Sequence, residues 1–182
     1  MPSDPPSSTS ARNGLLRAAA ALLAVACTGC FQVESLLNRD GSGTMTITYP
    51  GGPNLEAERA KFSSPNVSVH SITPAENKAV LQASFNDVTK LSTAEAFRTL
   101  IVRRQAVPGG ERLRVIVRNP KPSPSPNVTA VGSIAVTLPG PVTSANRGAE
   151  RHGNQVVWRI PIADLAAHRF TKLSVRYAVA GA

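Results

Sequence analysis

Cysteine is nearly absent from this chain of 182 residues, and its two cysteines, Cys27 and Cys30, both lie within the first 30 positions. The chain beyond them therefore cannot hold an internal disulfide, and its stability must come from packing. Histidine is also scarce. The three histidines are His70, His152 and His168. They are far apart in the sequence, and none has a second ligand at metal-binding spacing. We expect no metal site and no cofactor.

Recognisable catalytic motifs are missing as well. The sequence has no Gly-x-Ser-x-Gly elbow, no phosphate-cradling glycine loop and no His-Glu-x-x-His pair, and its acidic residues are too scattered to suggest an acid–base pair. The segment from Asn38 to Gly43 resembles a calcium loop faintly but lacks the acidic spacing and the late glutamate. We expect a protein that is not an enzyme.

Long hydrophobic runs are absent too. The apolar run from Ala18 to Ala26 has nine residues, whereas a helix that spans a bilayer needs about 20. Arg12 and Arg17 precede this run, and Cys27-Thr28-Gly29-Cys30 follows it. A basic flank, a short apolar core and small residues before a cysteine are typical of a bacterial lipoprotein signal peptide. We therefore predict that residues 1–29 are removed and that Cys30 is acylated, with palmitate as the expected type of chain.

Cys27 is the alternative acylation site, because the residues before it are small or aliphatic. Acylation of Cys30 is preferred, since it removes Cys27 with the signal and leaves no free thiol in an oxidising compartment. The following residue, Phe31, is not aspartate, as in lipoproteins sent to the outer membrane of cells with two membranes. We expect a protein anchored to the membrane on the extracytoplasmic side of the cell envelope.

Length and charge limit the remaining possibilities. Residues 30–182 have the size of a single domain. Removing Arg12, Arg17 and Asp4 with the signal lowers the net charge from +9 to +8. Outside the cytoplasm, this excess favours anionic lipid or acidic envelope polysaccharide as a partner, and we expect no nucleic acid.

Alternating apolar and polar residues predict an α+β fold of mainly antiparallel strands, about eight or nine in number, with one or two short helices. Asn38–Gly43 is expected to close a hairpin. Ser92 and Glu95 have the spacing of a capping box. The proline-rich segment 119–128 is expected to form an exposed loop. Strands are predicted over 31–37, 44–49, 66–73, 78–85, 100–105, 112–118, 133–138, 155–160 and 172–179, and helices over 55–62, near 92–97 and over 161–167.

The last third has the most distinctive sequence. Val156, Trp158 and Ile160 alternate with polar or smaller residues, which predicts that the single tryptophan is in the core with its indole N–H paired at the edge. The glycine- and asparagine-rich segment between Gly140 and Gln155 is expected to be a turn and a loop.

Taken in order, these pieces resemble the LppM-domain family of bacterial lipoproteins and envelope proteins, whose function is uncharacterised. The resemblance covers most of the chain after Cys30. It depends on the strand that follows this cysteine, the Asn38–Gly43 hairpin, and Leu138-Pro139-Gly140-Pro141-Val142 leading through Asn146 to Gly153–Trp158. It implies an exported antiparallel α+β domain, with lipid binding suggested for some relatives and no enzyme activity.

One group of basic residues suggests a binding site. Arg112, Arg114 and Arg118 alternate with Leu113, Val115 and Val117, so the arginines are expected on one face of a strand. The predicted partner strand adds more arginines. The candidate residues for an anionic ligand are Arg98, Arg103, Arg104, Arg112, Arg114 and Arg118. A solvated face of an antiparallel sheet is the competing interpretation.

Two functional hypotheses follow. The first is a non-enzymatic envelope lipoprotein that binds lipid or another anionic component through this basic face. The alternative is a protein-interaction or assembly lipoprotein without a small ligand, whose partner docks on a strand edge or on the proline loop.

Overall fold

The computed structural model describes residues 31–51, 54–123 and 129–179 of this chain. The predicted signal peptide, Cys27, Cys30 and part of the proline-rich segment, residues 124–128, lie outside the described residues.

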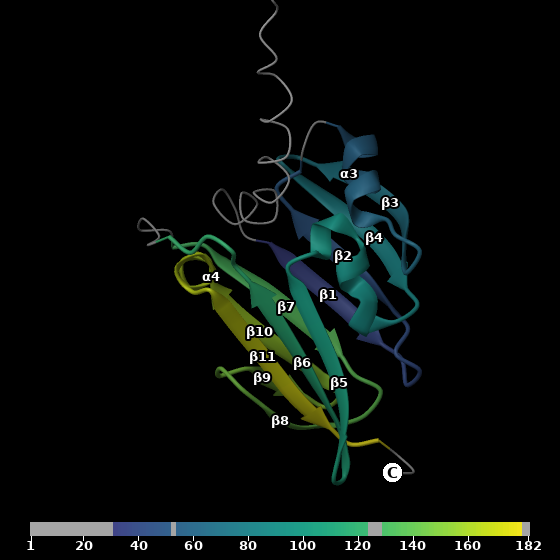
Figure 1. Ribbon diagram of the computed structural model, residues 1–182, viewed down its shortest axis with the longest axis vertical. Helices are drawn as coiled ribbons and strands as arrows, with labels where there is room; N and C mark the ends of the chain where they lie inside the picture. Colours follow the sequence, from purple (N-terminus) through teal and green to yellow (C-terminus); the bar gives the residue numbers. More distant parts are fainter. Residues whose placement is uncertain (1–30, 52–53, 124–128, 180–182) are drawn as a thin grey trace, which may run out of the picture.

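Strands of two sheets make up most of the fold (Figure 1). The larger, sheet A, has seven strands in the order β3-β4-β2-β1-β7-β10-β9. Strands β1 and β7 run parallel, and every other pair in the sheet is antiparallel. Its strands are β1 (Gln32–Leu37), β2 (Gly43–Tyr49), β3 (Val67–Ala75), β4 (Lys78–Phe85), β7 (Val131–Thr137), β9 (Glu150–His152) and β10 (Gln155–Pro161).

The smaller sheet, sheet B, is antiparallel throughout and has the order β5-β6-β11-β8. Strands β5 and β6 form a hairpin, and β11 pairs with β6 along its own whole length. The strands are β5 (Leu100–Val107), β6 (Gly110–Arg118), β8 (Val142–Ala145) and β11 (Phe170–Tyr177).

Short helices complete the fold: the α-helices α3 (Leu55–Phe62) and α4 (Ile162–Ala167), and the 3₁₀ helices η1 (Val88–Thr93) and η2 (Glu95–Phe97). Helix α3 begins where the side chain of Asn54 accepts a hydrogen bond from the Ala57 amide at 3.0 Å. Acidic residues in its first turn and basic residues in its last turn complement the helix dipole.

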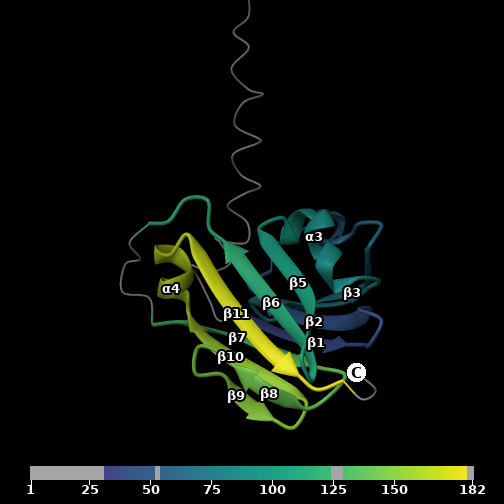
Figure 2. The same ribbon diagram turned by 60° about the horizontal axis from the view of Figure 1, so that its bottom comes forward.

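The hydrophobic core lies between sheet A and a second layer (Figures 1 and 2). Sheet B covers the β7–β10 side of sheet A. On the β2–β4 side, Tyr49 of β2 contacts Phe62 of α3, which in turn contacts Phe97 of η2. Trp158, Leu173 and other residues of both sheets form one cluster of buried side chains. Each sheet therefore has one buried face and one solvent-exposed face.

The structure confirms the α+β class and most of the expected elements. Trp158 is buried, and its indole N–H donates to the carbonyl of Asn146 at 3.1 Å. The capping-box prediction was wrong: Ser92 lies inside η1, and the residue that precedes η2 is Ala94, which makes no side-chain cap. The segment 142–152, predicted as a loop, contains β8 and β9, so sheets A and B together have more strands than predicted.

The distinctive segment from Leu138 to Trp158 is held by reciprocal hydrogen bonds. The Leu138 amide donates to the Asn154 carbonyl at 2.8 Å, and the Asn154 side chain donates back to the Leu138 carbonyl at 3.3 Å. Asn146 accepts from the Ser174 amide and donates to the Lys172 carbonyl. These hydrogen bonds hold the connection between β7 and β10 against β11. The distinctive residues of this segment therefore have a structural role.

Candidate anion-binding face

The outer face of sheet B is built by strict alternation along three neighbouring strands. On β6, Leu113 is buried against the core, so Arg112 and Arg114 point to the other side. The register places Arg103 of β5 opposite Arg114, and Arg176 of β11 opposite Arg112. We call this surface the basic face, and its cations are Arg103, Arg112, Arg114, Arg118, Lys172 and Arg176.

No ion pair offsets the charge of the basic face within the part of the chain that the structure describes. The three paired strands β5, β6 and β11 contain one acidic residue, Glu111, which lies on the inner face opposite Tyr177. The basic face is therefore a surface of uncompensated positive charge, which attracts phosphate or carboxylate groups.

A depression of about 470 Å³ lies beside the basic face, where β5 approaches η1, and residues from both faces of β5 line it. It is partly open to solvent. The residues that line it are Thr89, Val102, Arg103, Arg104, Gln105, Arg112 and Arg114. Three of these arginines belong to the basic face, and their guanidinium groups have the planar donor geometry that binds an anionic oxygen pair.

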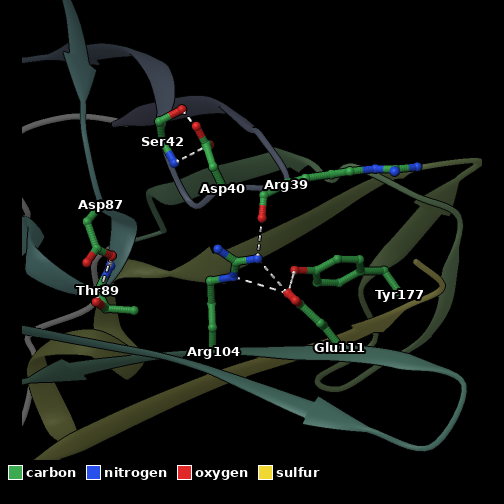
Figure 3. Close-up of polar contacts among 8 residues, drawn as sticks. All are labelled: Arg39, Asp40, Ser42, Asp87, Thr89, Arg104, Glu111 and Tyr177. Carbon is green, nitrogen blue, oxygen red and sulfur yellow. Dashed lines mark hydrogen bonds and ion pairs between the residues drawn. The ribbon is translucent and has the colours of Figure 1, made fainter. Parts of the chain in front are cut away.

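The structure separates Arg104 from the other predicted arginines. It lies opposite Leu113, on the inner face of β5, and its Nε and Nη2 donate to Glu111 Oε2 at 3.1 and 2.8 Å. The same guanidinium donates to the carbonyl of Arg39 in the β1–β2 loop at 2.8 Å (Figure 3). Arg104 therefore joins the two sheets. Its guanidinium is already bonded, so it is a weaker candidate for an external anion.

The Arg104 network also shifts the pKa values of its partners. Partial burial raises the pKa of Glu111, but hydrogen bonds from Tyr177 and Arg104 outweigh it and hold this pKa below its usual range. Burial, together with the hydrogen bond to Glu111, raises the pKa of Tyr177 to about 12. The network is thus set for an ionised Glu111 and a neutral Tyr177 at neutral pH.

Arg98 and Arg118 lie away from the centre of the face. Arg98 is exposed and lies between η2 and β5, so it is not part of the sheet. Arg118 closes β6 opposite Phe170. The prediction missed Lys172 and Arg176, because only the pairing of β11 with β6 brings them to the arginines of the hairpin. The sequence did contain one signal: Lys172, Ser174 and Arg176 alternate with Leu173 and Val175. This alternation indicates that one face of the strand is exposed to solvent, but it does not indicate which strand lies beside it.

Two of the histidines and the Asn38–Gly43 loop make local contacts. His70 lies 2.9 Å from the Ser84 hydroxyl, and His168 lies 2.9 Å from the Asp164 carbonyl. In the Asn38–Gly43 loop, Asp40 accepts from the amide and the hydroxyl of Ser42 at 2.9 and 2.7 Å. Within the described ranges, no three His, Cys, Asp or Glu residues are grouped as a metal site would require.

No family model and no curated protein sequence matches this chain. Among solved structures, the chain is similar to the folded domain of the Mycobacterium tuberculosis LppM protein, determined by NMR. The TM-score is 0.50 at 16% sequence identity, over 84% of this chain and 92% of that domain. This likeness shows an LppM-like fold. Across the described parts of the chain, no helix has the length and apolarity needed to cross a membrane.

Proposed function

We propose that this chain is a non-enzymatic lipoprotein of the bacterial cell envelope that binds anionic lipid head groups through the basic face. One observation carries the proposal: six cations lie on one face of an antiparallel sheet, and no carboxylate of those strands shares that face. Like charges on neighbouring strands repel one another, and an anionic surface against this face would relieve that repulsion.

A membrane surface suits this arrangement better than a small ligand. The cations extend over three strands rather than converging on one point, and the depression beside them is only partly enclosed. Each basic residue near an anionic bilayer contributes about 1 kcal/mol. Arginine also binds a phosphate through two parallel hydrogen bonds.

The lipoprotein part of the proposal has two supports. The first is the sequence pattern from Arg12 to Cys30, which is typical of a processed and acylated N-terminus. The second is the LppM-like fold, which agrees with the family resemblance of the sequence. Stable attachment to a membrane generally takes two signals. If an acyl chain is one of them, even weak binding by the basic face is enough to keep the domain on the bilayer.

Co-sedimentation with lipid vesicles tests the binding. The chain from Phe31 onward, which lacks cysteine, is mixed with vesicles of phosphatidylcholine alone or with phosphatidylglycerol added. We expect binding only to the anionic vesicles. The variant with Arg103→Gln and Arg114→Gln should bind at least about tenfold more weakly, since two cations leave the surface.

A matched control removes the same charge elsewhere. Arg39 lies in the β1–β2 loop, and Arg159 lies on the outer face of sheet A, where it pairs with Glu150. The variant with Arg39→Gln and Arg159→Gln should bind anionic vesicles almost as tightly as the unchanged chain. Equal losses in the two double variants would mean that net charge, not the basic face, controls binding. No loss in either would remove lipid from the proposal and favour a protein partner.

A further inference from the structure

The basic face has an apolar end. Ile101 of β5, Ile116 of β6 and Lys172 of β11 form one row across the sheet, and Phe170 lies opposite Arg118 in the next row. Ile101 is 38% exposed and Phe170 is 45% exposed. Both side chains point away from the core, because their neighbours Val102 and Thr171 are buried. Large apolar side chains grouped on a surface are typical of a contact site.

Cations surround this apolar end. Arg118 and Lys172 come from the basic face, and the guanidinium of Arg169 lies 5.8 Å from the centre of the Phe170 ring. Apolar side chains among long basic ones suit the bilayer interface, where the rings and branched chains enter the acyl boundary and the cations reach phosphates.

The apolar end lies at the same end of the fold as the entry of the chain from Cys30. The Phe31 carbonyl accepts from the Ser133 amide at 2.9 Å, next to Gly132 at the start of β7. In Figure 1, strands β1, β5, β7 and β11 all run downward, so each begins at its own upper end. Helix α4 links the end of β10, which pairs with the start of β7, to Phe170. Since Cys30 directly precedes Phe31, an acyl chain on it would hold this end at the membrane.

We propose that Ile101 and Phe170 insert into the membrane interface, and that this contact sets the orientation of the domain, with the outer face of sheet B against the bilayer and the outer face of sheet A away from it. The inference rests on the proposed function, which supplies the anionic membrane, and adds an insertion depth and an orientation to it.

A second copy of this chain is a poorer occupant of the apolar end than a membrane. A symmetric dimer through this surface would bring two sets of Arg118, Arg169 and Lys172 together, and like charges at an interface cost several kcal/mol. An anionic bilayer covers the same apolar side chains and neutralises the cations around them. The positive charge around the apolar end therefore favours lipid.

Site-specific fluorescence tests the orientation. In the full chain with Cys27→Ser and Cys30→Ser, a single cysteine is introduced as Phe170→Cys, Ile101→Cys or Leu36→Cys and labelled with an environment-sensitive dye. Leu36 is the matched control, because it is 48% exposed on the outer face of sheet A. On phosphatidylglycerol vesicles that contain spin-labelled lipid, we expect quenching at positions 101 and 170 and little at position 36.

A binding measurement gives a second readout. In the same cysteine-free chain, the double variant Phe170→Ser with Ile101→Ser should bind vesicles about tenfold more weakly. The reason is that less apolar surface is removed from water on binding. Leu36→Ser should leave the binding unchanged.

Each outcome separates the two proposals. A chain that binds anionic vesicles while the dye at position 170 stays in water overturns the insertion but leaves the proposed function standing. Equal quenching at 36 and 170 overturns the orientation. Absence of charge-dependent binding overturns the proposed function itself. A change of the dye at 170 without vesicles, with a doubled mass in solution, would identify a second copy as the occupant.

Discussion

Arg103 and Arg114 lie directly opposite each other on β5 and β6, and both side chains are on the solvent side of sheet B. Side chains at paired positions of an antiparallel ladder are about 5 Å apart at their Cβ atoms. No carboxylate lies on this face of the three paired strands. The pair therefore costs the fold stability and provides a site where one anion can contact two guanidinium groups.

The first prediction is that Arg114→Gln stabilises the protein while it weakens vesicle binding. Relief of the repulsion from Arg103 should raise the free energy of unfolding by about 0.2–1 kcal/mol, measured by urea denaturation at low ionic strength. Salt should reduce this gain, because it screens exposed charges. The control Arg39→Gln should give neither effect. A less stable Arg114→Gln variant would mean that the arginine is needed for packing.

The second prediction concerns Gly41, which the Arg104 guanidinium approaches closely. Gly41 has φ +94°, and a Cβ built there would lie 2.5 Å from Arg104 Nη1. Gly41→Ala should lower the free energy of unfolding by about 1–3 kcal/mol, through backbone strain and displacement of Arg104. Gly109→Ala is the control for strain alone, since Gly109 has φ +80° and no atom within 4 Å of its Cβ position. Equal losses in a urea titration would show that Arg104 adapts without cost.

The third prediction is a loss of stability in acid caused by Glu111. Its lowered pKa means that the folded state favours the ionised carboxylate. This contribution is complete above the ordinary pKa of about 4.5 and is lost as pH falls through the lower folded value. Urea midpoints measured from neutral pH downward should fall more steeply for the unchanged chain than for Glu111→Gln. Glu95→Gln, at an exposed position on η2, should keep the steeper dependence. Parallel curves for the unchanged chain and Glu111→Gln would exclude this linkage.

The fourth prediction concerns the anchor. In a bacterial host fed labelled palmitate, the unchanged chain and Cys27→Ser should be labelled and found in the membrane fraction. Cys30→Ser should lose the label, because the modified sulfur is absent. The reverse pattern would assign the anchor to Cys27. Equal labelling or equal membrane retention of the double variant would contradict the lipoprotein proposal.

Local elements were predictable because their signals are local. The Asn38–Gly43 turn ends one strand and begins the next, and Gly41 supplies the positive φ that it needs. Val156, Trp158 and Ile160 alternate with a period of two, so their burial on one face followed directly from the sequence. The capping box predicted at Ser92 was wrong even though its signal is local. The structure forms the 3₁₀ helix η1 at this point, and η1 is capped by Asp87.

Long-range pairing was not predictable in the same way. The parallel contact of β1 with β7 joins segments about 100 residues apart, and short strands such as β9 are stable only beside a longer neighbour. The same limit explains the candidate site. Arg103 and Arg104 are adjacent in sequence, yet strand alternation places them on opposite faces, one in solvent and one bonded to Glu111.

The amino-acid sequence by itself determined the positive charge, the absence of disulfides beyond Cys30, and the strands whose alternation needs no partner to be recognised. The tertiary structure alone decided that Lys172 and Arg176 join the arginines of the β5–β6 hairpin, and that Phe170 and Ile101 lie at one end of the same face. The physical reason is that alternation fixes which side of its own strand a residue occupies, whereas the neighbouring strand is chosen by packing of the whole core.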